Sequence, residues 1–369
     1  MGGVDSRRGP GPLGGGCAVR IGLVGLPGSG KTTIFNLLTG LKKDLDGSTH
    51  GRTEPNVGVL KVPDPRLERL AEITESKRKV QAEVALVDVL GARPSRGASG
   101  LGAEDVARHV EDADAFCVVI GAFAVDGPGA VAQLEDVLLS LALADLAKVE
   151  RRLERVLRDI QRGKKEGERE RALLEHVRAP LEAGVGLAKA LPAERDRVEL
   201  RGFQFLSAKP VAVLENVRDD DAGTDGALAD VCRLQRYPHT VVAGRLELEI
   251  AELPPEEQLG FLSEYGIRSS ARERCISSVY EALDAVTFYT IAHGEARAWP
   301  VRSGTVALDA AGAVHSDMKA GFIRAEVIPF DVLAEVGSLA ECRARGVVRL
   351  EGRDHVVHDG DIITFRFSS

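Results

Sequence analysis

Short apolar runs alternate with amphipathic segments over much of the chain. Residues 19–24 form a β-branched run, and Ile34, Leu37 and Leu38 follow at helical spacing after a glycine-rich loop. Three more runs, at residues 84–89, 116–120 and 211–214, have the uniform apolarity of strands that are buried on both faces. This pattern predicts an α/β fold built on a doubly wound parallel sheet.

A charged helical segment interrupts the sheet pattern between the runs at 116–120 and 211–214. Apolar side chains recur every three or four positions, and the polar stretch 163–170 separates them from a weaker helical pattern at 171–191. We therefore predict two antiparallel helices inserted into the sheet domain. The apolar stripe of the first helix comprises Leu139, Leu143, Leu146, Val149, Leu153, Val156 and Ile160.

The same segment carries many basic side chains. They are Arg151, Arg152, Arg155, Arg158, Arg162, Lys164 and Lys165. One interpretation is a stripe that faces RNA. The other is an ordinary solvated helix face, which the interspersed acidic residues favour.

The pattern changes again after Leu283. Short strands are expected at residues 287–291, 324–330, 347–352 and 361–367, with turn residues between them, and they predict a small mixed β domain. Basic residues near Trp299 and Phe322 are suited to RNA contacts, whereas each ring taken singly fits the core of such a domain better.

Composition narrows the choice of partners and compartment. The 369 residues predict two or three domains, and the net charge of -8 excludes a chain coated with positive charge, so we predict no DNA partner and only local RNA contacts. Five scattered cysteines favour the reducing cytoplasm. No run of about 18 apolar residues is present, so no membrane partner is predicted, and the Gly/Pro-rich residues 1–17 are expected to form a disordered leader.

The sequence GLPGSGKTT, Gly25 to Thr33, follows the first predicted strand and precedes a helix, which is the context that a phosphate-binding loop requires. Backbone N–H groups of such a loop converge on phosphates at the positive end of the helix. Lys31 is expected to bridge the β- and γ-phosphates, and the Thr32 hydroxyl to bind Mg²⁺. The predicted phosphate-binding residues are Gly25, Gly28, Ser29, Gly30, Lys31, Thr32 and Thr33.

Two further elements complete a candidate nucleotide site. Asp88 ends a predicted strand and can hold Mg²⁺, while the N–H of Gly91 can approach a γ-phosphate, so Lys31, Asp88 and Gly91 form the predicted catalytic set. A second strand exit, Asn216 to Asp219, matches a base-recognition element with Val217 in place of the usual lysine. The Asp219 carboxylate favours guanine, and the alternative is an ordinary strand-to-loop exit.

The motifs resemble the YchF/Obg-like ATPases, within the translation-factor class of P-loop proteins. Beyond the phosphate loop, the resemblance rests on residues 54–73, 144–155, 295–299, 315–328 and 350–367. It implies a nucleotide-binding domain in two parts, residues 18–136 and 205–286, with an inserted hairpin at 137–204 and a C-terminal β-grasp TGS domain at 287–369. It also implies slow hydrolysis, ATP preferred over GTP, and association with the ribosome or its RNA.

Several positions depart from the family pattern. Gly28 stands where the family usually has Asn, which related enzymes use at this position to help hold a monovalent cation, and Asp219 stands where Glu is common. The family's first switch implies a Mg²⁺ ligand at or beside Thr53, and its last base-contact element falls at Ala243 and Gly244. Two hypotheses follow: a slow ATPase, with GTP as an alternative substrate, or a nucleotide-dependent binding module without useful turnover.

Mg²⁺ is the one cofactor that the sequence predicts. Histidines such as His355 and His358 are not grouped with cysteines or carboxylates at the usual metal-ligand spacings, so no second metal site is predicted.

Overall fold

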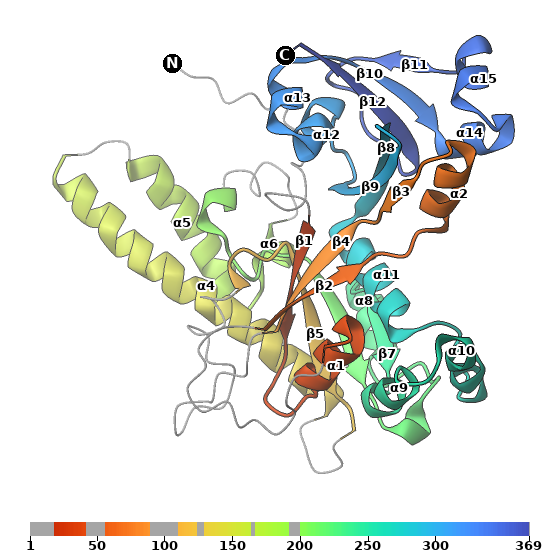
Figure 1. Ribbon diagram of the computed structural model, residues 1–369. Helices are drawn as coiled ribbons and strands as arrows, with labels where there is room; N and C mark the ends of the chain where they lie inside the picture. The colour runs from red at the N-terminus through yellow and green to blue at the C-terminus, as the bar shows by residue number, and fades with distance from the viewer. Residues whose placement is uncertain are drawn as a thin grey trace. The chain divides into compact units, whose positions relative to one another are not determined.

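The apolar runs of the sequence form neighbouring strands of one six-stranded sheet in the computed structural model, which describes residues 18–41, 56–88, 110–123, 129–163, 167–191 and 200–368 (Figure 1). The sheet has the order β2-β4-β1-β5-β6-β7. Its strands are β1 (Ala18–Val24), β2 (Asn56–Lys61), β4 (Glu83–Asp88), β5 (Ala115–Gly121), β6 (Val211–Asn216) and β7 (His239–Val242). The β1/β5, β5/β6 and β6/β7 pairs are parallel, and every residue of β5 is buried, as the uniform apolar runs predicted.

The described residues divide into two compact units. One comprises Ile21–Gly58 and Leu86–Val279, and the other contains Val59–Ala85 and Tyr280–Ser369 together with residues 18–20. The domain boundaries given above stay predictions, and the expected leader, residues 1–17, lies outside the described residues.

Helices of the first unit connect its strands, and three more follow its last strand, β7. They are α1 (Lys31–Thr39), α4 (Ala130–Gln161), α5 (Gly167–Glu182), α6 (Leu187–Ala190), α8 (Ala229–Gln235), α9 (Gly244–Ile250), α10 (Pro255–Glu264) and most of α11 (Ala271–Leu283), with the short 3-10 turns η1 (Arg201–Phe203) and η2 (Asp219–Asp221). The first turns of α4 pack Leu134, Val137 and Leu141 against Phe116 and Val118 of β5. This packing anchors the long helix to the sheet.

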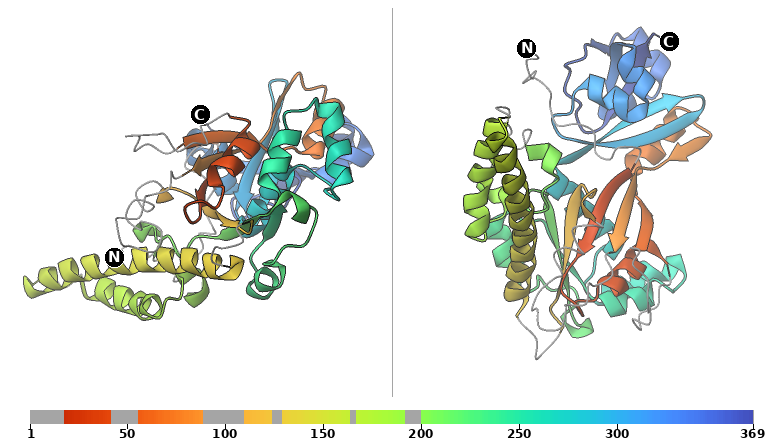
Figure 2. Two further views of the ribbon diagram at one scale, coloured as in Figure 1. Left: turned by 90° about the horizontal axis from the view of Figure 1, so that it is seen from below. Right: turned by 90° about the vertical axis from the view of Figure 1, so that its left-hand side faces the viewer.

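The predicted helical hairpin is present as α4 and α5, which lie side by side and antiparallel (Figures 1 and 2). Val149, Leu153 and Val156 of α4 share a core with residues of α5. The first half of the predicted stripe is wrong, because Leu139 is 41% and Leu143 48% exposed. Here α4 meets the sheet on one side and the hairpin core on the other: Leu141 packs with β5, and Ala142 packs with residues of α5, so these two side chains are buried instead.

Asp145 ties the hairpin to the strand that follows it. The side chain is 1% exposed and accepts hydrogen bonds from the backbone N–H groups of Leu206 at 2.8 Å and Ser207 at 2.7 Å, and from the Ser207 hydroxyl at 2.6 Å. Burial raises the pKa of this carboxyl, and the three hydrogen bonds oppose the shift. The sequence pattern gave no sign of this buried acid, which fixes the start of the segment leading into β6.

Asp145→Ala is expected to lower the free energy of unfolding by about 3 kcal/mol, because it leaves two buried N–H groups and a hydroxyl without an acceptor. Chemical denaturation of the full chain measures the loss. Asp136→Ala, at an exposed position of the same helix, is the matched control and should change stability little. Equal stability of the two variants would contradict the assigned role of Asp145.

The second unit is a mixed sheet with the order β11-β10-β12-β8-β9-β3. Its strands are β3 (Arg78–Val80), β8 (Ala285–Ala292), β9 (Glu295–Arg302), β10 (Phe322–Pro329), β11 (Arg349–Glu351) and β12 (Asp361–Phe367), and its helices are α2 (Pro65–Ile73), α12 (Ala307–Val314), α13 (Ser316–Ala320), α14 (Phe330–Val336) and α15 (Leu339–Ala344). β12 pairs with β8 in parallel, whereas β8/β9 and β10/β12 are antiparallel. The predicted mixed β domain is therefore confirmed, although the parallel edge pairing of β3 with β9 was not foreseen.

Both rings of the candidate RNA surface lie in the core of this unit. Trp299 is 6% and Phe322 9% exposed, and the Trp299 indole N–H donates to the Thr290 hydroxyl at 2.9 Å. The interpretation of these rings as core residues is confirmed. Within the described part of the chain, no helix has the length and apolarity needed to cross a bilayer.

Candidate functional site

The loop between β1 and α1 has the geometry of a phosphate-binding loop. Gly30, at the N-terminal cap of α1, has φ +88°, and a Cβ there would lie 2.2 Å from the Asn216 Nδ2 atom. A Cβ at Gly25 would lie 2.3 Å from the Val119 carbonyl oxygen. No side chain fits at either position, so the two glycines let the loop curl closely against β5 and β6.

The side chain of Lys31 folds back over the phosphate loop and bonds to its backbone. Its Nζ donates to the carbonyl oxygens of Gly25 and Leu26, each at 2.9 Å, and its side chain is 8% exposed. Burial lowers the pKa of the ammonium group, and the nearby Asp88 carboxylate opposes that shift. Thr32 and Thr33, both half-buried, follow on the first turn of the helix.

Asp88, the last residue of β4, faces this helix start and is 1% exposed. Burial raises the pKa of its carboxyl, and Asn56, Lys31 and the Thr32 hydroxyl each oppose the shift. One carboxylate oxygen accepts from Asn56 Nδ2 at 3.5 Å, whereas Oδ1 has no hydrogen-bond partner among the described residues. A buried oxygen of this kind beside a threonine hydroxyl fits a hard cation such as Mg²⁺.

The end of β6 connects the loop to the predicted base-recognition elements. Asn216 donates from Nδ2 to the Ser29 carbonyl at 3.1 Å and accepts the Gly244 N–H at 3.1 Å. The Ala243 N–H donates in turn to the Glu247 carboxylate at 3.1 Å. Asn216 therefore fixes the spacing between the phosphate loop and the segment at Ala243 and Gly244.

Val217 and Asp219 lie in different surroundings. Val217 is 6% exposed and packs with Ala243, Leu246 and Ile250 in an apolar cluster. Asp219 is exposed and begins the turn η2. Of the two, Asp219 has the accessible polar atoms that recognition of a base needs.

Not every predicted site residue is placed. Thr53 and Gly91 lie outside the described residues, whereas the loop residues Gly25 to Thr33, Asp88, Asn216, Ala243 and Gly244 come together in one unit. Sequence reasoning missed Asn56, whose amide faces Asp88. Two signals could have identified it: Asn56 lies at the start of an apolar strand, and it falls within residues 54–73, which carry part of the family resemblance.

Comparisons with known proteins agree with this geometry. A family model described as a 50S ribosome-binding GTPase matches residues 20–162, and the YchF-GTPase C-terminal model, described as a protein of unknown function, matches residues 285–368. The chain is 34% identical to the ribosome-binding ATPase YchF of Bacillus subtilis, over 95% of this chain and 100% of that protein. It is 32% identical to Obg-like ATPase 1 of Oryza sativa, over 95% and 92% of the two chains.

Solved structures show the same fold. The YchF GTPase of Schizosaccharomyces pombe superposes with a TM-score of 0.79 at 25% identity, covering 97% of this chain and 100% of that one. A GTP-binding protein of Pyrococcus horikoshii superposes with a TM-score of 0.58 at 17% identity, covering 95% and 100% of the two chains. At that identity the second match speaks for the fold alone.

Proposed function

The chain belongs to the YchF family, and we propose that it binds and slowly hydrolyses ATP as a switch that associates with the ribosome. It is a P-loop NTPase of the same fold as its relatives. The single observation that carries the proposal is the convergence of Lys31, Thr32 and Asp88 behind a loop in which Gly25 and Gly30 admit no side chain. Such a site is built for phosphate groups.

Catalysis in this site is electrostatic positioning. The Lys31 ammonium group exchanges its two loop carbonyl acceptors for phosphate oxygens, and the N–H groups at the start of α1 hold the remaining phosphate charge. Thr32 and Asp88 are the residues that would hold Mg²⁺. When bound, the ion would neutralise part of the negative charge of the phosphates. Gly91 and Thr53 are proposed to respond to the γ-phosphate. Water attacks in line, and no covalent intermediate forms.

Asp219 is the residue that argues for GTP over ATP. Its exposed carboxylate can accept hydrogen bonds from guanine, whereas the names of the bacterial relatives specify ATP. The buried Val217 does not supply the aliphatic stem that a lysine would lay over a base. We therefore propose ATP as the preferred nucleotide, with GTP as the second candidate.

Calorimetric titration with non-hydrolysable ATP and GTP analogues in the presence of Mg²⁺ is expected to show tighter ATP binding, which Asp219→Ala leaves unchanged. Asp220→Ala, at the next exposed position of the same turn, is the control. If GTP binds more tightly and Asp219→Ala abolishes that preference while Asp220→Ala does not, Asp219 reads guanine and the chain is a GTPase.

The ribosome partner rests on relatives whose names describe ribosome binding, and it implies a cytoplasmic site of action. We propose that residues 287–369 act as a TGS-like β-grasp domain in that association, which the central parallel pairing of β12 with β8 supports. If phosphate contacts dominate, cosedimentation with ribosomes should fall steeply as salt rises. Binding that is insensitive to salt would contradict an electrostatic interface.

A further inference from the structure

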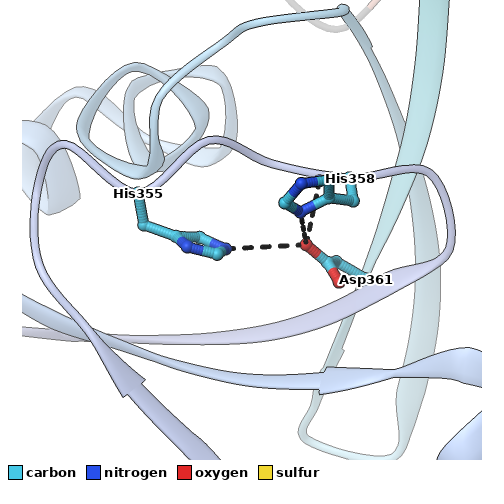
Figure 3. A group of neighbouring side chains, drawn as sticks. All are labelled: His355, His358 and Asp361. Carbon is cyan, nitrogen blue, oxygen red and sulfur yellow. Dashed lines mark hydrogen bonds and ion pairs between the residues drawn. The ribbon is translucent and has the colours of Figure 1, made fainter.

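Two histidines from the segment before β12 converge with Asp361, the first residue of that strand, far along the chain from the residues of the nucleotide site (Figure 3). His355 Nε2 and His358 Nδ1 each lie 3.7 Å from Asp361 Oδ2. The three candidate ligand atoms all lie within 4.8 Å of one another. The sequence expectation that these histidines are not grouped with a carboxylate is therefore wrong, because the turn between His358 and Asp361 folds back on itself.

We propose that His355, His358 and Asp361 bind a divalent transition-metal ion of the Zn²⁺ class. Two imidazoles and one carboxylate form a donor set that suits Zn²⁺, and three protein ligands leave a fourth position for water or for a partner's side chain. Ligand atoms about 2.0 Å from a tetrahedral ion lie roughly 3.3 Å apart. Both nitrogen-to-oxygen distances need to shorten by only a few tenths of an ångström to reach that value.

The buried histidine is already oriented for this role. The His355 side chain is 12% exposed, and its Nε2 has no hydrogen-bond partner among the residues that the structure describes. Its other nitrogen, Nδ1, lies 3.5 Å from the Glu351 carboxylate. In the proposed site, Glu351 would accept the Nδ1–H hydrogen bond and leave the Nε2 lone pair for the metal ion, which is the usual second-shell arrangement of metal-binding histidines.

Backbone hydrogen bonds hold the loop that carries these side chains. The Ala307 N–H donates to the His355 carbonyl at 2.7 Å, and the Val357 N–H donates to the Thr305 carbonyl at 2.9 Å. The ligands are therefore attached to a fixed segment, so that little ordering is needed when an ion binds.

A purely structural role explains only part of the cluster. Asp361 Oδ2 accepts the backbone N–H of His358 at 2.9 Å, which accounts for a carboxylate in this turn. Ion pairing of the two rings with the same oxygen accounts for their direction when the histidines are charged, but it leaves a buried imidazole nitrogen without a hydrogen bond, and the ring centroids lie only 5.7 Å apart. A carboxylate oxygen that accepts one N–H retains a lone pair for a metal ion.

The test is a Zn²⁺ titration of the full chain, after treatment with a chelator, in competition with a chromophoric chelator and with excess Mg²⁺ to occupy oxygen-rich sites. We expect one Zn²⁺ per chain, and a loss of affinity of at least about tenfold in His358→Gln and His355→Gln. His176→Gln, at an exposed histidine of α5, is the matched control and should bind as the wild type does. Glu351→Gln should weaken binding by about tenfold, because it removes the carboxylate that orients His355.

Two further measurements test whether the variants stay folded and which side chains bind the ion. The His358 side chain is 69% exposed, so His358→Gln should melt at the wild-type temperature without metal and lose only the stabilisation that Zn²⁺ adds. Co²⁺ in place of Zn²⁺ should give visible bands without a thiolate charge-transfer band. Wild-type affinity in His358→Gln, no uptake of Zn²⁺ by the wild type, or a thiolate band that points to cysteine ligands would each overturn the proposal.

Discussion

Lys31→Met is expected to lower the rate of ATP hydrolysis by on the order of 10²–10³-fold, because it removes the ammonium group that lies behind the phosphate loop next to Asp88. Methionine preserves most of the aliphatic stem that is buried against the loop, so the fold is retained. The variant loses the positive charge that stabilises the negative charge developing on the phosphate oxygens in the transition state. Phosphate release at saturating ATP and Mg²⁺ measures the effect.

Lys61→Met is the matched control, since Lys61 is an exposed residue at the end of β2. It should hydrolyse ATP at the wild-type rate. Equal rates for wild type and Lys31→Met would mean that the observed hydrolysis arises elsewhere, or from a contaminant, and would exclude the assigned role of Lys31. A melting temperature close to that of the wild type separates loss of chemistry from loss of fold.

Asp88→Asn is expected to lower hydrolysis by about 100-fold and to raise the Mg²⁺ concentration needed for half-maximal activity. The change preserves shape and removes the negative charge that faces Thr32 and Lys31. An amide is also a poorer ligand for Mg²⁺ than a carboxylate. Hydrolysis assayed over a series of Mg²⁺ concentrations gives both effects together.

The same isosteric change at the other end of β4, Glu83→Gln, controls for altered strand stability. It should leave both the rate and the Mg²⁺ dependence as they are in the wild type. A normal Mg²⁺ dependence in Asp88→Asn would show that Asp88 is not part of the metal site, even if its rate were low.

Features encoded by adjacent residues were predictable from the sequence. The strand, loop and helix around Gly25 to Thr33 follow from local spacing, and the buried strands follow from uniformly apolar runs. Asp88 was found because the carboxyl ends of parallel strands meet at one edge of a sheet. The small mixed β domain after Leu283 was likewise predictable, from short strand-like runs separated by turn residues.

Features that depend on distant contacts were not predictable. Asn216 bonds to Ser29 across 187 positions of the chain, and β3 pairs with β9 at the edge of a sheet formed mainly by the C-terminal residues. The α4 stripe was misassigned at Leu139 and Leu143 because periodicity identifies a helix without telling which neighbour each turn meets. His355 and His358 were missed because their carboxylate partner, Asp361, is the first residue of the next strand and does not stand at a standard ligand spacing.

Single-turnover hydrolysis of γ-labelled ATP by excess protein, with Mg²⁺ and with Lys31→Met alongside, tests the central claim most directly. If the chain is a slow ATPase, the wild type converts the bound ATP to ADP and phosphate in a single exponential phase, far above the rate of the variant. Phosphate release by the wild type at the level of Lys31→Met would contradict the claim and leave a nucleotide-dependent binding protein.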